Sequence, residues 1–178
     1  YNHEIDLIAP FIEALKCENV KNSYRLILYG NTISNEKWNQ LGLSEIAEYR
    51  GWLDYSKDVS TLKDIDVFLQ LLDDNNVSKA GWPNKLGDYL AFGKPVILSP
   101  YGDIIDFVKN EKGFFIVEYN KYSILKILQE IKDIPYSDLK TMGYANRQLA
   151  EKISWKNRAK NIEYICNKIR FNNETVKN

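Results

Sequence analysis

Hydrophobic positions along the chain alternate between the spacing of helices and that of strands. Ile5, Ile8, Ile12 and Leu15 recur every three to four residues, which predicts an amphipathic helix at the start of the chain. Later apolar runs are short and nearly continuous, which is typical of strands in a sheet that is covered on both faces. They predict five strands, at residues 24–29, 48–52, 67–72, 96–98 and 113–117.

Polar and helical stretches separate these strands. Residues 56–63 form a small predicted helix with Ser56 as its N-cap, and residues 73–83 form a long polar loop. Asn84 is a suitable N-cap for the next helix, which we expect to end at Gly93. After the fifth strand the pattern predicts three more helices, at residues 122–132, 136–152 and 155–171, the last capped by Ser154.

The order of these elements predicts the fold class. Strands that alternate with helices through short links form parallel sheets with helices on both faces. We therefore expect one α/β domain over residues 1–178, with a Rossmann-like, doubly wound parallel sheet of five to six strands. Gly30, Gly51 and the loop before Asn84 all follow the carboxyl ends of strands. Ligands of open α/β sheets bind at that edge, so the function is to be sought there.

Composition narrows the possible functions. The chain has 24 basic and 24 acidic side chains, so it lacks the net positive charge typical of nucleic-acid-binding domains. His3 is the single histidine, which leaves no material for a histidine metal site or a Ser-His-Asp triad. Cys17 and Cys166 are far apart and are expected to be reduced, buried thiols. No apolar run is long enough to span a bilayer and no signal peptide opens the sequence, so we expect a cytoplasmic protein.

Three common phosphate-binding motifs are absent. A dinucleotide fingerprint needs three spaced glycines after a strand, and Gly30 stands alone. Gly93 and Lys94 are followed by a proline, and the upstream glycine of a P-loop is replaced by Asp88. A receiver domain would have its acidic cluster after the first strand, whereas Asp73 and Asp74 follow the third.

The segment 81–97 does predict a phosphate site. It joins a loop to the start of a helix at the ligand edge, where free N–H groups and the helix dipole favour an anion. Lys85 adds a positive charge in the first helical turn. Asp88 follows one turn later, where a carboxylate beside a phosphate needs hydrogen-bond donors such as the two hydroxyls of a ribose. The combination predicts a site for a nucleoside diphosphate.

Each of these residues also has a purely structural interpretation. Asn84 can serve as the N-cap alone, Lys85 as a solvated side chain, and Asp88 as a favourable charge near a helix start. Gly81 is explained either by a positive φ or by a close backbone approach. Trp82 is either an anchor of the loop or a stacking surface.

An ordered set of motifs resembles the donor-binding, C-terminal domain of GT-B glycosyltransferases, specifically glycosyltransferase family 4. Residues 85–97 match the family pattern K-L-x-E-Y-x-A-x-G-K-P-V-I most fully. Six shorter stretches are similar as well. Residues 25–30 resemble the family's glycine-ended strand, residues 49–53 its F-x-G strand, and residues 64–69 its A-D-V-F-L strand. Residues 101–106 resemble its G-G-x-x-D loop, residues 112–117 its N-G-x-L-V strand, and residues 153–155 its F-S-W helix start.

The resemblance assigns roles to several positions. Asp88 stands at the second glutamate of the family's E-x7-E motif, which holds the ribose hydroxyls. Ala80 replaces the first glutamate, which contacts the donor sugar, and Asp73 or Asp74 is a candidate to compensate for it. The positions expected near the phosphates, base or sugar of the donor are Gly30, Gly51, Trp52, Gly81, Asn84, Gly102 and Asp103, with Lys85 as the catalytic residue.

The resemblance also implies an activity. We expect the donor domain of a retaining, metal-independent transferase that moves a sugar from a UDP- or GDP-sugar to a carbohydrate or lipid-linked acceptor, in polysaccharide or glycoconjugate synthesis. It implies that the acceptor-binding N-terminal domain and the first strand precede the chain, that the chain alone is inactive, and that the whole protein associates peripherally with the membrane. A nucleotide-binding module without catalysis and a GT-B nucleotide-sugar epimerase are the alternatives.

Overall fold

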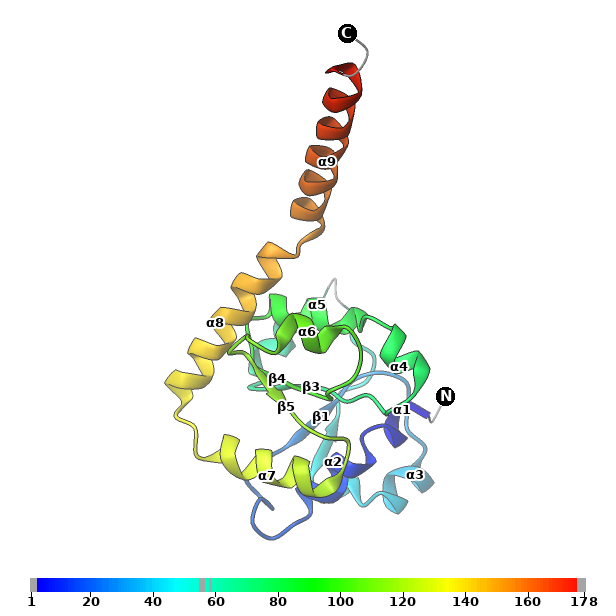
Figure 1. The fold of residues 1–178 in the computed structure, drawn as a ribbon. Helices are drawn as coiled ribbons and strands as arrows, with labels where there is room; N and C mark the ends of the chain where they lie inside the picture. Colours follow the sequence, from blue (N-terminus) through cyan, green and yellow to red (C-terminus); the bar gives the residue numbers. More distant parts are fainter. Residues whose placement is uncertain (1–2, 55–56, 58, 176–178) are drawn as a thin grey trace.

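Five short parallel strands lie at the centre of the computed structural model, which describes residues 3–54, 57 and 59–175 (Figure 1). In each strand three residues have regular geometry, fewer than most of the apolar runs suggest. The strands are β1 (Leu26–Leu28), β2 (Ala47–Tyr49), β3 (Phe68–Gln70), β4 (Val96–Leu98) and β5 (Phe114–Ile116).

The strands form two hydrogen-bonded sheets. β1 pairs with β2, with Leu26 opposite Ala47, and β3, β4 and β5 pair in that order, with Phe68 opposite Val96. Both sheets are parallel throughout, as predicted, but among the described residues they are not joined into the single sheet that we expected. They share a core all the same, because Leu26 of β1 and Ile97 of β4 belong to one cluster of buried side chains.

Helices cover both faces of the sheets (Figure 1). α2 and α7 pack together on one face, and α5 and α8 pack together on the other. The described α-helices are α1 (His3–Asp6), α2 (Ala9–Leu15), α3 (Asn35–Gln40), α4 (Asn76–Ala80), α5 (Asn84–Ala91), α6 (Ile104–Val108), α7 (Lys121–Lys132), α8 (Tyr136–Lys152) and α9 (Trp155–Thr175). Two short 3₁₀ helices, η1 (Leu43–Glu45) and η2 (Val59–Asp64), precede β2 and β3.

Two predicted elements differ in the structure. The opening helix is broken between α1 and α2, because Pro10 in the first turn of α2 has no N–H with which to continue α1. The predicted loop 73–83 contains the one-turn helix α4, which starts where the Asn75 side chain accepts a hydrogen bond from the Ser78 N–H, 2.8 Å away. The N-cap predicted at Ser56 lies outside the described residues.

Residues of α8 pack against the carboxyl end of α5 and form hydrogen bonds there. Asn146 is fully buried, and its Nδ2 donates to the carbonyls of Lys94 at 2.8 Å and Gly113 at 2.9 Å. Gly143 lies so close to the turn after α5 that a Cβ on it would stand 2.1 Å from the Gly93 carbonyl oxygen. Arg147 Nη1 donates to the Ala91 carbonyl at 2.6 Å. The position of α5 therefore depends on α8 as well as on the sheet.

α9 extends away from the rest of the chain (Figure 1). The Ser154 hydroxyl accepts from the Asn157 N–H at 3.4 Å, which confirms Ser154 as its cap. Exposed apolar side chains include Trp155, which is 84% exposed, and Ile162, which is 62% exposed. Cys166 is exposed as well and Cys17 is partly buried, so the prediction that both thiols are buried was wrong. No helix in the described part of the chain is both long enough and apolar enough to cross a membrane.

Candidate functional site

Two of the predicted glycine turns meet at the carboxyl edge of β1 and β2. The Gly30 N–H donates to the Gly51 carbonyl at 2.9 Å, and the Tyr49 hydroxyl donates to the Gly30 carbonyl at 2.8 Å. Gly30 has a φ of +135° and Gly51 a φ of +76°, conformations that favour glycine. Trp52 follows with 72% of its surface exposed, so its ring is available to a ligand at this edge.

A polar network that the sequence analysis missed lies beside these turns. Arg50 Nε donates to Glu48 Oε1 at 2.8 Å, and Arg50 Nη1 donates to the Tyr29 hydroxyl at 3.4 Å. The Tyr29 hydroxyl donates in turn to Thr61 Oγ1 at 2.9 Å, which links β1 to η2. The hydrogen bond from Arg50, together with its positive charge, lowers the pKa of the Glu48 carboxyl. The hydrogen bonds that Arg50 makes to Glu48 and Tyr29 raise the pKa of its guanidinium. The spacing of Glu48 in β2 and Arg50 just after it, two residues apart, was the signal available in the sequence.

The acidic residues proposed to replace the family glutamate are engaged within their own turn. Asp73 Oδ1 accepts from Asn75 Nδ2 at 2.7 Å and from the Ser78 hydroxyl at 2.9 Å. Asp74 forms an ion pair with Lys79. These contacts shape the start of α4, while Ala80 is its exposed last residue. The arrangement gives Asp73 and Asp74 a structural role.

The first turn of α5 presents the central candidates. Leu86 and Leu90 are fully buried against the sheet, while Asn84, Lys85 and Asp88 are exposed. At about 100° per residue, the exposed three share one face of the helix. The prediction that Asn84 caps this helix was wrong: Pro83 is the N-cap residue, no side chain caps the helix, and no acidic residue lies in its first turn. Proline holds the extended conformation needed there and Asn84 is already helical.

The loop that precedes α5 packs against α4 and α6. Gly81 has a φ of −96°, so it is not explained by a positive φ, and a Cβ on it would lie 3.1 Å from the Val77 carbonyl oxygen. The Trp82 ring packs edge-on to Phe107 with centroids 5.3 Å apart, which supports its role as a loop anchor.

Gly102 follows β4 and approaches α4 closely. Its φ is +81°, and a Cβ on it would lie 2.9 Å from the Lys79 carbonyl oxygen, so both conformation and space require glycine. Asp103 is exposed at the start of α6 and does not cap that helix with its side chain. The candidates at this edge thus form two groups. One is the pair of hydrogen-bonded turns at Gly30 and Gly51, called here the Gly30–Gly51 corner, and the other is the loops around α5.

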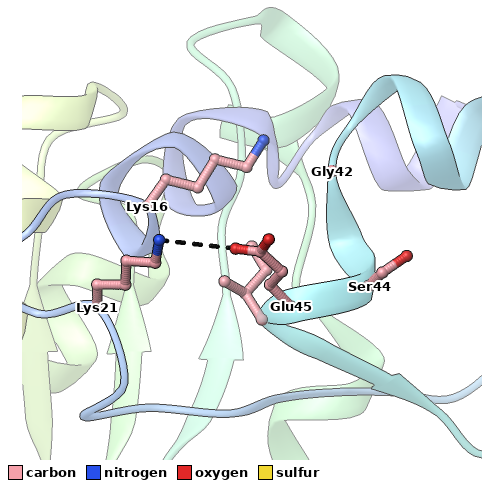
Figure 2. Close-up of a pocket in the computed structure, with 6 residues that line it drawn as sticks. Lys16, Lys21, Gly42, Ser44 and Glu45 are labelled. Carbon is pink, nitrogen blue, oxygen red and sulfur yellow. Dashed lines mark ion pairs between the residues drawn. The ribbon is translucent and has the colours of Figure 1, made fainter.

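A separate pocket of about 350 Å³ lies at the opposite edge of the sheet (Figure 2). Lys21 precedes β1, and Glu45 and Ile46 precede β2, so the pocket is at the amino ends of these strands. Lys21 and Glu45 form an ion pair across it with 3.6 Å between Nζ and Oε2, and Lys16 Nζ donates to the Leu41 carbonyl at 2.5 Å. None of the residues predicted for the donor site lines this pocket.

The part of the chain that the structure describes contains no group of three or more His, Cys, Asp or Glu side chains that could hold a metal ion.

Comparison with known proteins gives a family and a fold. The model of the family described as "Glycosyl transferases group 1" matches residues 8–149. Three crystal structures of Anabaena Alr3699/HepE are similar: the complex with UDP, with a TM-score of 0.59 and 17% identity, and the complexes with UDP and glucose and with UDP-glucose, each with a TM-score of 0.61 and 14% identity. No curated protein matches the chain.

These structures confirm the predicted α/β fold class, with parallel sheets flanked by helices. The similarity covers 80% of this chain and 40%, 39% and 40% of the three compared chains. The chain therefore spans about two fifths of the length of these structures.

Proposed function

The chain belongs to the glycosyl transferases group 1, and from that membership we propose that it binds a nucleoside-diphosphate sugar as the donor domain of a glycosyltransferase. The observation that carries the proposal is the amino end of α5. It has no side-chain cap and no acidic residue in its first turn, and it presents Lys85 and Asp88 on one exposed face. Uncapped N–H groups with a lysine suit a diphosphate, and a carboxylate one turn away suits a ribose.

The similar structures support the donor class. Alr3699/HepE has been crystallised with UDP, with UDP and glucose, and with UDP-glucose. A chain with this fold, whose residues 85–97 match the family pattern, is expected to take a UDP- or GDP-sugar. Membership of family 4, a retaining outcome and a role in polysaccharide or glycoconjugate synthesis are part of the proposal, as is an acceptor bound by a further domain.

The proposed chemistry rests on stabilising the departing diphosphate. Negative charge grows on the phosphate oxygens as the bond to the sugar breaks, and Lys85 with the first N–H groups of α5 neutralises it. Asp88 holds the ribose and fixes the diphosphate relative to Lys85, while Trp52 and the Gly30–Gly51 corner lie where the base would be held. Loss of one preorganised donor of this kind typically costs about 10²–10³ in rate.

Calorimetric titration with UDP and with GDP tests the site. We expect Lys85→Ala and Asp88→Ala each to weaken binding by about 1–3 kcal/mol, because each leaves a ligand group without its partner. Lys160→Ala and Glu163→Ala are matched controls, since both residues are exposed on α9, far from α5 in sequence. Unchanged affinity in both α5 variants would refute the assignment.

One observation favours a second candidate, a nucleotide-binding module without catalysis. Ala80 provides no carboxylate for the sugar, and Asp73 is already bonded to Asn75 and Ser78. A longer protein that includes the acceptor domain separates the two candidates. Release of nucleoside diphosphate only when an acceptor is added supports transfer, whereas binding without release supports the module.

A further inference from the structure

Both backbone polar groups of Gly30 are bonded to the β2 side of the sheet. Its N–H donates to the Gly51 carbonyl at 2.9 Å, and its carbonyl accepts from the Tyr49 hydroxyl at 2.8 Å. The second bond fixes the plane of the peptide between Gly30 and Asn31. In a trans peptide the C=O and the following N–H point in opposite directions, so the Asn31 N–H points away from the Tyr49 hydroxyl.

The Asn31 N–H is thus directed away from the Tyr49 side of the turn at the carboxyl edge. Asn31 is exposed, and within the described part of the chain its N–H has no hydrogen-bond partner. A glycine at φ +135° has no side chain to restrict the turn, so without a further bond this peptide would rotate easily. The Tyr49 hydroxyl supplies that bond from the neighbouring strand.

We infer that Tyr49 is a positioning residue, which orients the Gly30–Asn31 peptide so that its N–H meets the nucleotide of the donor. The inference rests on the proposed function and adds one residue to it that does not itself touch the ligand. Removing the hydroxyl leaves the ring in place, and the related F-x-G motif has phenylalanine at this position, so Tyr49→Phe is compatible with the fold. Without the hydroxyl the turn at Gly30 is less ordered in the free chain, so the nucleotide has to order it on binding and binds more weakly.

The test compares Tyr49→Phe with Tyr24→Phe in the full chain. Tyr24 is the matched control, because its hydroxyl also donates to a backbone carbonyl, that of Leu128 in α7, but it precedes β1 and so lies at the other edge of the sheet. We expect Tyr49→Phe to weaken UDP or GDP binding about three- to tenfold, the equivalent of one hydrogen bond, and Tyr24→Phe to leave it unchanged. Hydrogen exchange of the Gly30 amide, measured without nucleotide, should be faster in Tyr49→Phe alone.

The outcomes separate this inference from the proposed function. A lower melting temperature with unchanged nucleotide affinity would make Tyr49 merely structural and overturn the inference. Equal Gly30 exchange in wild type and Tyr49→Phe would overturn it even if nucleotide binds. If the wild type binds neither UDP nor GDP while Gly30 exchange still responds, the proposed function fails, and the nucleotide role of Tyr49 fails with it.

Discussion

The phenol of Tyr24 shows how the fold changes the chemistry of a single residue. Burial is the main cause that raises its pKa from 10.0 to about 12, the charge of Asp133 adds to the effect, and a backbone hydrogen bond at Lys132 opposes it. Its hydroxyl also donates to the Leu128 carbonyl, which joins the segment before β1 to α7. The folded chain therefore favours the protonated phenol more than the unfolded chain does.

This difference predicts a dependence of stability on pH. The contribution of Tyr24 is fully present below its unfolded pKa near 10 and is lost as the pH rises toward about 12, because the unfolded chain releases the proton first. Urea unfolding of wild type and Tyr24→Phe from pH 9 to 12 measures it. The stability advantage of the wild type should shrink over that window; a constant difference would contradict the assignment.

Residue types at the candidate site were easier to predict than their local contacts. Lys85 and Asp88 are on the exposed face of α5 that the helical spacing predicts, and their role toward a ligand stays a prediction. Asn84 was misplaced by one position, since proline and asparagine both suit a helix start and spacing does not rank them. The contacts of Tyr29, Arg50 and Thr61 depend on strand pairing between distant segments, which a local pattern does not contain.

At the scale of elements, long periodic segments were predicted well and short ones poorly. α7 and α8 match the expected ranges closely, since each has several turns with one apolar face. α4 was read as loop because its five residues have too few apolar positions to show a period, and a local cap at Asn75 starts it. A single sheet was predicted where the structure has two, because an apolar run indicates that a strand is buried but does not indicate which strand it pairs with.

The contact between α5 and α8 gives a prediction at this scale. Gly143→Ala should lower the free energy of unfolding by about 1–3 kcal/mol, because its Cβ would stand 2.1 Å from the Gly93 carbonyl and 3.2 Å from the Lys94 Cα. Gly87→Ala is the control: a Cβ there meets nothing within 4 Å, so it should gain about 0.5–1 kcal/mol from helix propensity. Chemical unfolding measures both. Equal stability of the Gly143 variant and wild type would contradict this prediction, because it would show that α8 can move away from the turn after α5 without loss of stability.

At the scale of the whole molecule, stability comes from two clusters of buried side chains on opposite faces of the sheets. One joins α2 and α7 to β1, β2 and β4, and the other joins α5, α6 and α8 to β3 and β4. Among the side chains that the structure describes, neither cluster includes a residue of α9. We therefore expect the rest of the fold to form without that helix.

A shortened chain tests this division. A chain that ends at Ser154 should change the free energy of unfolding by less than about 0.5 kcal/mol, or about 2 °C in melting temperature, because α9 is largely exposed. A chain that ends at Asp133 also loses Asn146 and Leu149 from the fold and should unfold at a much lower temperature. Thermal unfolding followed by circular dichroism measures both. A large loss of stability in the chain that ends at Ser154 would mean that α9 stabilises the rest of the fold.

The side-chain hydrogen bonds from α8 are made at the carboxyl end of α5, while Leu86 packs its first turn against the sheet. Arg147 and Asn146 hold its last turn and the residues that follow, whereas its first turn begins at Pro83 without a side-chain cap. Eight residues of helix are about 12 Å long, so a tilt of about 10° at the held end moves the other end by about 2 Å, enough to break a hydrogen bond. A shift of α8 that tilted α5 against the packing of Leu86 would thus displace Lys85, and substitutions in α8, remote from any ligand, would alter its recognition.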